Sequence, residues 1–112
     1  MEKRNILLFC EAGMSTSIMV KKMTESCEKH NMPFEISAHM ITKAVDLVEK
    51  MDPVLVLLGP QVKFLESKMR KQLAKYDVPI DVIDTALYGA MDGEEVMKQV
   101  VRILKEHKAS KE

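Results

Sequence analysis

Two short segments of the chain are apolar throughout, without alternation between apolar and polar positions. They are Ile6–Phe9 and Val54–Leu58. Continuous runs of this length are typical of strands that are buried on both faces, as in a parallel sheet covered by helices. Phe34–Ala38 and Pro79–Ile83 show weaker apolar patterns and are two further strand candidates. The chain is therefore expected to contain four strands.

Apolar residues between and after these strands recur at steps of three and four, which is the spacing of one face of an α-helix. The four sets are Met19, Met23 and Cys27; Val45, Leu47, Val48 and Met51; Val62, Leu65, Met69 and Leu73; and Val96, Met97, Val100, Val101 and Leu104. Strands that alternate with helices predict right-handed crossovers and a parallel sheet. We expect a three-layer α/β/α fold in a single domain over residues 1–112, with a polar tail at 105–112 that frays.

The length and charge of the chain narrow the classes of function. A chain of 112 residues fits one domain. Its 17 Lys and Arg residues balance its 17 Asp and Glu residues, so no basic surplus is available for a nucleic-acid backbone or an anionic membrane surface. The apolar runs are too short for a membrane-spanning helix, and the first residues lack the apolar length of a signal peptide. We expect a cytoplasmic protein.

Cysteine and histidine are too few and too scattered for a disulfide framework or a metal site. Cys10 and Cys27 do not form a Cys-x-x-Cys pair. No pair of the three histidines has a third ligand at a metal-binding spacing. We therefore expect no metal and no cofactor. Cys27 lies on the apolar face with Met19 and Met23, so we expect it to pack in the core.

The segment that follows the first strand has the composition of an anion-binding loop. In an open α/β sheet, ligands bind at the carboxyl ends of the strands, where Cys10 stands. Gly13 allows the backbone to approach a ligand closely, and hydroxyl groups at 15–17 can cap the following helix. The N–H groups at a helix N-terminus bind anions and favour a thiolate. The expected phosphate-binding residues are Glu11, Ala12, Gly13, Met14, Ser15, Thr16 and Ser17.

A thiolate within such a loop is the arrangement needed for attack on phosphorus. A phosphoryl group on Cys10 would carry about −1.5 to −2 charges and would need several hydrogen-bond donors. Packing is the alternative role for a cysteine that ends a strand. The glycine and the three hydroxyl residues that follow Cys10 favour the nucleophile. Glu11 would repel a phosphoryl group that it faced, so we expect its side chain to point to solvent or to a partner.

The loop Cys10–Ser17 resembles that of the B component of the bacterial sugar phosphotransferase system, in the lactose/cellobiose (diacetylchitobiose) family. The segment Leu57–Val62 resembles the motif of that family after the third strand, and Ile83-Asp84 together with Leu87–Gly93 resembles its motif after the fourth. The resemblance implies a flavodoxin-like sheet of four parallel strands in the order 2-1-3-4. It also implies that Cys10 accepts a phosphoryl group from a phosphohistidine of the A component. Cys10 would then pass the group to a sugar bound in the membrane-embedded C component.

The strand order that the resemblance implies would make the loops after the first and third strands neighbours. Gly59, Pro60 and Gln61 would then lie near Cys10, with Gln61 facing the site or a partner. The alternative is that Gly59-Pro60 is only a turn and Gln61 a solvated helix start. Tyr88 and Asp92 follow the fourth strand on the same edge. They are candidates for partner contact, and the alternatives are core packing for Tyr88 and a helix start at Asp92.

Two other classes of protein compete with the carrier. Low-molecular-weight tyrosine phosphatases and related arsenate reductases share a Cys-x5-Arg loop, but Thr16 stands at the arginine position. Without a guanidinium, the transition state loses its bidentate clamp, which disfavours a phosphatase. The second competitor is a non-catalytic anion-binding module. A receiver-type module is disfavoured because Leu58-Gly59 stands where its acceptor aspartate would be.

Overall fold

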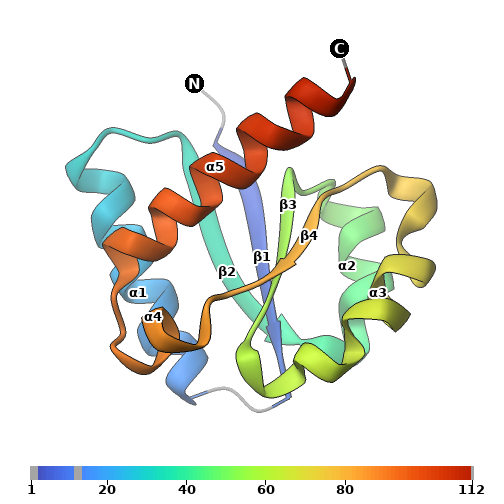
Figure 1. The fold of residues 1–112 in the computed structure, drawn as a ribbon, viewed down its shortest axis with the longest axis horizontal. Helices are drawn as coiled ribbons and strands as arrows, with labels where there is room; N and C mark the ends of the chain where they lie inside the picture. The colour runs from blue at the N-terminus through green and yellow to red at the C-terminus, as the bar shows by residue number, and fades with distance from the viewer. Residues whose placement is uncertain (1–2, 12–13, 112) are drawn as a thin grey trace.

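The four strands form one parallel sheet with the two most apolar strands at its centre. The computed structural model describes residues 3–11 and 14–111. The strands are β1 (Arg4–Cys10), β2 (Phe34–Met40), β3 (Leu55–Leu58) and β4 (Ile80–Val82), in the order β2-β1-β3-β4 (Figure 1). The α/β class, the four strands and the order 2-1-3-4 are therefore confirmed.

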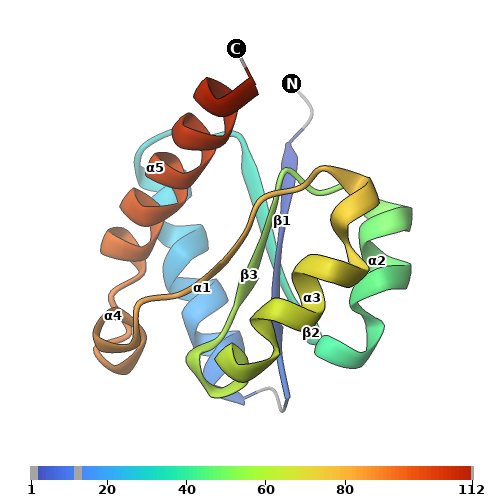
Figure 2. The ribbon, with the colours of Figure 1, turned by 45° about the vertical axis from the view of Figure 1, so that its right-hand side comes forward.

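Helices cover both faces of the sheet. α1 (Met14–Lys29) and α5 (Gly93–Lys111) lie on one side, and α2 (Ala44–Met51) and α3 (Glu66–Gln72) lie on the other (Figures 1 and 2). Successive residues of β1 alternate between the two cores: Leu8 packs with α1 and α5, and Leu7 packs with α2 and α3. Burial on both faces explains why the central strands are apolar without alternation.

The core predicted on the first helix is present. Met19 and Met23 are fully buried, and Cys27 is 2% exposed. Burial raises the pKa of the Cys27 thiol above its ordinary value. A raised pKa keeps the thiol protonated and poorly nucleophilic, so Cys27 is a packing residue.

The helical segment after β3 differs from the expectation of one continuous helix. A 3₁₀ helix (Pro60–Leu65) with a kink at Val62 leads into α3, and a second 3₁₀ helix (Ala74–Tyr76) follows. The apolar residues still face the sheet, because Val62, Met69 and Leu73 are buried. A step of three residues, as from Val62 to Leu65, fits one side of a 3₁₀ helix and is also compatible with an α-helix, so this pair could not tell the two apart.

A short helix, α4 (Thr85–Gly89), lies between β4 and α5 and was not predicted. The carboxylate of Asp84 caps it by accepting hydrogen bonds from the N–H groups of Ala86 (2.9 Å) and Leu87 (3.2 Å). α5 continues to Lys111; fraying of residues 105–112 stays a prediction.

Candidate functional site

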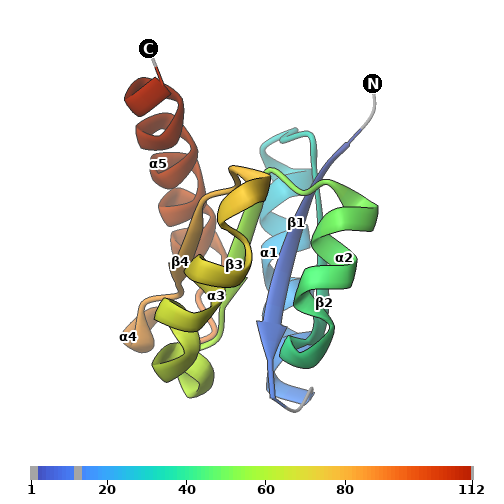
Figure 3. The same cartoon turned by 90° about the vertical axis from the view of Figure 1, so that its right-hand side faces the viewer.

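Cys10 is the last residue of β1, at the carboxyl edge of the sheet. Figure 3 shows this edge at the end of the molecule opposite to both chain termini. Cys10 pairs in register with Met40, the last residue of β2. Only 4% of Cys10 is exposed, whereas the adjacent Glu11 is exposed, as expected. The residue thus lies just below the surface of this edge.

The loop after β3 lies directly beside Cys10. The N–H of Gly59 donates a hydrogen bond of 3.0 Å to the carbonyl oxygen of Phe9. A Cβ atom placed on Gly59 would lie 3.7 Å from the Cβ of Cys10 and 2.9 Å from Oε1 of Gln61. The Gln61 side chain therefore folds back over Gly59 on the side of Cys10. The two loops are neighbours, as the strand order requires.

Gly59 and Pro60 also form a tight turn, which the sequence offered as the alternative to a role at the site. The N–H of Val62 donates to the carbonyl oxygen of Gly59 at 3.0 Å, which closes the turn. Pro60 opens the 3₁₀ helix, where its missing N–H has no consequence. Both features hold together, because a tight turn is what brings the exposed Gln61 next to Cys10.

The first turn of α1 is anchored by a buried hydrogen bond. Thr16 is fully buried, and its Oγ1 lies 3.2 Å from the hydroxyl oxygen of Tyr88 in α4, with either group able to donate. Tyr88 is 5% exposed, so it packs in the core and also holds this turn. Ser17 is exposed on the next position. Sequence reasoning missed the Thr16–Tyr88 contact, because nothing local relates two residues 72 positions apart.

For four of the predicted phosphate-binding residues, the structure describes only the backbone or nothing at all. Ala12 and Gly13 lie outside the described residues, as do the side chains of Met14 and Ser15. The start of α1 at Met14 is described. The N–H groups of a first helical turn have no acceptor within the helix, so this start provides donors four residues after Cys10.

Asp92 begins a helix, as the alternative interpretation of this residue held. Its carboxylate accepts a hydrogen bond of 3.1 Å from the N–H of Glu95, and its carbonyl oxygen accepts from Val96. Gly93 follows and packs against α1: a Cβ atom there would lie 2.5 Å from the carbonyl carbon of Lys22. These contacts tie α4 and the beginning of α5 to α1. Contact of Asp92 with a partner stays a prediction.

Comparison with known proteins decides the family. A family model described as the lactose/cellobiose-specific IIB subunit of the phosphotransferase system matches residues 5–99. The chain belongs to this family. It is a IIB component of the lactose/cellobiose type, and such components are phosphotransferases that carry a phosphoryl group on a cysteine. It acts together with other components of the phosphotransferase system.

Individual relatives agree over nearly the full length. The oligo-β-mannoside-specific EIIB component of Bacillus subtilis is 38% identical over 101 residues, which are 90% of this chain and 96% of that protein. The cellobiose-specific EIIB component of Lactococcus lactis is 35% identical over 100 residues, 87% of this chain and 93% of that protein.

Solved structures agree with the fold. The solution structure of a cellobiose-specific IIB component from Borrelia burgdorferi has a TM-score of 0.75 and 31% identity, covering 94% of each chain. The lactose-specific IIB domain from Streptococcus pneumoniae has a TM-score of 0.80, covering 90% of this chain and 97% of that one. At 13% identity, this second likeness shows the fold alone.

Three large apolar side chains are exposed on segments that adjoin the Cys10 edge of this IIB component: the end of β2, the first turns of α1 and the 3₁₀ helix after β3. Met40 ends β2 and is 54% exposed, Ile18 lies early in α1 and is 49% exposed, and Phe64 follows Gln61 and is 72% exposed. Sequence reasoning missed these three as surface residues. A signal was available, because Ile18 and Phe64 both fall off the apolar faces of their helices.

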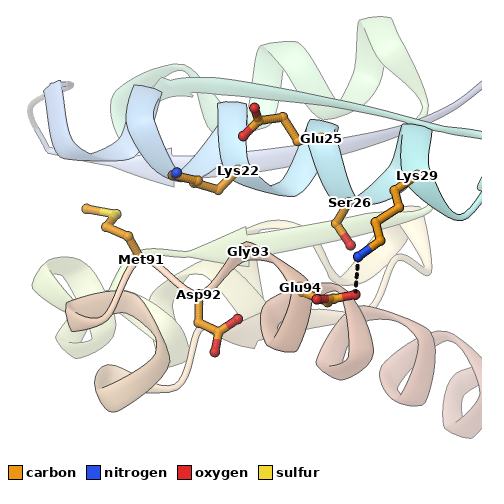
Figure 4. A pocket seen from close by; sticks show the side chains of 8 residues that line it. All are labelled: Lys22, Glu25, Ser26, Lys29, Met91, Asp92, Gly93 and Glu94. Carbon is orange, nitrogen blue, oxygen red and sulfur yellow. Dashed lines mark ion pairs between the residues drawn. The ribbon is translucent and has the colours of Figure 1, made fainter.

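A cavity of about 290 Å³ lies between α1 and the beginning of α5 (Figure 4). The hydroxyl of Ser26 is buried there, with no hydrogen-bond partner among the described residues. Glu94 accepts from His30 (2.8 Å) and pairs with Lys29 (3.9 Å), and these contacts lower the pKa of its carboxyl. The lining mixes both signs of charge, so it favours neither an anion nor a cation.

Metal-binding groups do not gather in the described part of the chain: it holds no cluster of three His, Cys, Asp or Glu side chains suited to an ion. No helix within residues 3–11 and 14–111 combines the length and the apolar character that a membrane crossing requires.

Proposed function

We propose that Cys10 is the phosphoryl carrier of this IIB component. The observation that carries the proposal is its position at the carboxyl end of the central strand, four residues before the first turn of α1. A phosphoryl group on its sulfur would meet the N–H donors and the positive end of the α1 dipole. Cys27, the only other cysteine of the chain, is buried in the core and far less suited to the role.

The reaction consists of two transfers of one phosphoryl group. In the first, the Cys10 thiolate attacks the phosphorus of a phosphohistidine on an A component; the S–P bond forms and the N–P bond breaks. In the second, the hydroxyl oxygen of a sugar bound in the C component attacks the same phosphorus. The O–P bond forms, the S–P bond breaks to release the Cys10 thiolate, and the proton of the sugar hydroxyl passes to a base of the C component. Both transfers are in-line displacements that depend on position and on charge stabilisation.

The donors for the phosphoryl group would come from residues 11–17. The hydrogen bond between Thr16 and Tyr88 supports a backbone role for Thr16, because its hydroxyl already has a partner. Ser15 and Ser17 would add hydroxyl donors, and Gly13 would let the backbone approach the phosphoryl oxygens. Gln61 would contribute from the second loop, since its side chain lies over Gly59 beside Cys10.

The site is better suited to holding a phosphoryl group than to hydrolysing it. Thr16 occupies the position at which a phosphatase has its arginine, and it is buried against Tyr88. No guanidinium at this position can therefore clamp the equatorial oxygens in a hydrolytic transition state. The low exposure of Cys10 also limits the access of water, which a carrier must avoid.

The exposed residues Met40, Ile18 and Phe64 would form the docking surface for both partners in turn. Flexible and apolar side chains suit a surface that binds two different proteins and releases each of them. Glu11 would influence docking from within this surface. The chain would work in the cytoplasm and approach the membrane through the C component.

The sugar would be determined by the C component. The related EIIB components are named for oligo-β-mannoside, galactose and cellobiose, although each is similar to this chain over most of its length. We infer a sugar of the lactose/cellobiose type.

Intact mass spectrometry tests the carrier. The protein is incubated with phosphoenolpyruvate, the general phosphotransferase proteins and a candidate A component. We expect one added phosphoryl group in the wild type and in Cys27→Ser, and none in Cys10→Ser. Addition that persists in Cys10→Ser would refute the proposal. Hydrolysis of an aryl phosphate through Cys10 would indicate a phosphatase. Phosphate binding with neither phosphorylation nor hydrolysis would indicate an anion-binding module.

A further inference from the structure

The formal net charge of zero hides an uneven distribution of charge. Residues 60–76, which form α3 and the two 3₁₀ helices beside it, contain five basic residues and one carboxylate. The basic residues are Lys63, Lys68, Arg70, Lys71 and Lys75, and all of them are exposed. The carboxylate is Glu66. This segment therefore carries a net positive charge, although the chain as a whole is neutral.

The basic residues of this segment are not equally available. Arg70 donates two hydrogen bonds to Glu66, at 2.6 and 3.2 Å, so these two charges offset each other. The remaining basic residues are all lysines. Among the residues that the structure describes, none of these lysines lies within ion-pair distance of a carboxylate.

Three of the lysines and one exposed aromatic ring belong to this segment. Lys68 and Lys71, three residues apart in α3, lie on one side of that helix, whereas Phe64 and Lys75 belong to the 3₁₀ helices before and after it. The buried residues Val62, Met69 and Leu73 pack in the core. We call the four exposed residues Phe64, Lys68, Lys71 and Lys75 the lysine stripe. It begins three residues after Gln61 and continues through α3 to the second 3₁₀ helix.

The chemistry of the lysine stripe fits a diffuse anionic surface. Lysine is a compact charge on a flexible stem, whereas arginine suits bidentate contacts with individual groups, and the single arginine of the segment is already engaged. Helices that lie on lipid headgroups combine Lys and Arg side chains with Trp, Phe or Leu side chains that enter the interface. An exposed Phe64, at 72%, is available for this contact.

We propose that the lysine stripe rests on the anionic lipid headgroups of the membrane. The proposal extends the proposed function, because transfer to a membrane component requires Cys10 to reach the membrane surface. Contact along the stripe would hold the protein on the bilayer beside that component and raise its local concentration there. Each lysine near an anionic surface strengthens binding about fivefold, and salt screens the effect over about 10 Å.

A second group of basic residues offers a matched control. Arg102, Lys105 and Lys108 lie exposed on the last turns of α5. This end of α5 lies by the C-terminus, away from the Cys10 edge (Figure 1). Binding through α5 would turn Cys10 away from the membrane, so a test that compares the two groups also tests the orientation.

Co-sedimentation with lipid vesicles is the experiment. Vesicles of phosphatidylcholine with 30% phosphatidylglycerol (roughly the anionic content needed for a strong surface potential) are compared with pure phosphatidylcholine. We expect the wild type to bind only the anionic vesicles, and added salt to release it. The triple variant Lys68→Gln, Lys71→Gln, Lys75→Gln should bind about a hundredfold more weakly. The triple variant Arg102→Gln, Lys105→Gln, Lys108→Gln should lose much less.

The outcomes separate this proposal from its alternatives. Equal losses in the two triple variants, or no binding of the wild type, would overturn it. If the wild type does not bind vesicles and the triple lysine variant accepts phosphoryl groups from a soluble A component more slowly, the partner of the lysine stripe is an acidic protein surface instead. The vesicle assay is repeated with Cys10→Ser, which should bind normally. Vesicle binding by a protein whose Cys10 takes no phosphoryl group would refute the carrier while leaving the lipid contact standing. Unchanged thermal midpoints confirm that the variants are folded.

Discussion

The two loops that meet at Cys10 are built in opposite ways. The loop after β1 leads into a 16-residue helix whose first turn is held from behind by the buried bond between Thr16 and Tyr88. The loop after β3 leads into a kinked 3₁₀ helix that presents Gln61 and Phe64 to solvent. The anchored loop is suited to fixing hydrogen-bond donors around a phosphoryl group. The exposed loop is suited to meeting partners. The two loops therefore differ in how firmly they are held and in how far they are exposed.

The contact between α1 and α5 at Gly93 should give the largest effect on stability. Gly93→Ala should destabilise the protein by about 3 kcal/mol, because the new Cβ would lie 2.5 Å from the backbone of Lys22 and would push α5 away from α1. Urea unfolding of the purified variant measures the change. A loss below about 1 kcal/mol would mean that the α1–α5 contact yields easily and does not anchor the first loop.

Loss of the Tyr88 hydroxyl should have the next largest effect. Tyr88→Phe leaves the buried hydroxyl of Thr16 without this partner, at a cost of about 1–3 kcal/mol. It should also slow phosphorylation of Cys10 by loosening the first turn of α1. A double-mutant cycle with Thr16→Val measures the coupling between the two hydroxyl groups. In each variant the free energy of unfolding is measured with denaturant, and the rate of Cys10 phosphorylation is measured by labelling. Strictly additive effects would show that the contact holds nothing in place.

Gly59→Ala should change stability by less than about 0.5 kcal/mol. Gly59 has a φ of −64°, which alanine adopts readily. The one close contact of the new Cβ is with the end of the Gln61 side chain, at 2.9 Å, which can move aside. Phosphoryl transfer from the A component should nevertheless slow several-fold, because Gln61 is displaced from Cys10. A wild-type transfer rate in Gly59→Ala would show that Gln61 takes no part in phosphoryl transfer.

Phe64→Ala should leave stability within about 0.5 kcal/mol of the wild type, because the side chain is exposed. We expect a several-fold higher KM for the A component with kcat unchanged, the pattern of lost docking contact. Steady-state labelling at varied A-component concentration separates the two constants. Ser67→Ala, a neighbouring exposed position, is the control. A fall in kcat alone would place Phe64 in the chemistry instead.

The smallest expected effect is a pH dependence from His39 in β2, which packs against Phe9 (6.1 Å between ring centres). Burial, and secondarily Lys43, lowers the pKa of this imidazole below 6.5. The folded state therefore binds its proton less well than the unfolded state. The His39 contribution to stability should be complete above about pH 6.5 and be lost as the pH falls through the lower, folded pKa. Thermal midpoints of His39→Gln between pH 5 and 8, a range set by that reference value, should show a weaker decline toward acid than the wild type; identical profiles would contradict the assignment.

The sequence predicted the strands better than the helical segment after β3. Unbroken apolar runs at Ile6–Phe9 and Val54–Leu58 have few alternatives to a buried parallel strand. The strand order came from the family resemblance, since hydrophobic pattern alone does not encode which strands pair. α4 is too short to have a period, and Asp84 is recognisable as its cap only once the five residues after it are known to be helical.

Long-range features escaped the sequence for a different reason. The Thr16–Tyr88 bond depends on how α1 packs beside α4, and neither residue carries a local sign of it. A net charge of zero conceals the local surplus of basic residues at Lys68, Lys71 and Lys75. A count over a short window would have revealed it, because residues 60–76 contain five basic residues and one carboxylate.

The central position of β1 also determines when the Cys10 edge can form during synthesis. β1 is the first strand to leave the ribosome, but its second neighbour is completed only at Leu58, and Tyr88 and α5 come later still. Every strand pairing in this sheet joins segments distant in sequence, a topology that folds slowly. Nascent chains that end before α5 therefore hold a cysteine without its surroundings. Acceptance of a phosphoryl group would then mark the completion of folding.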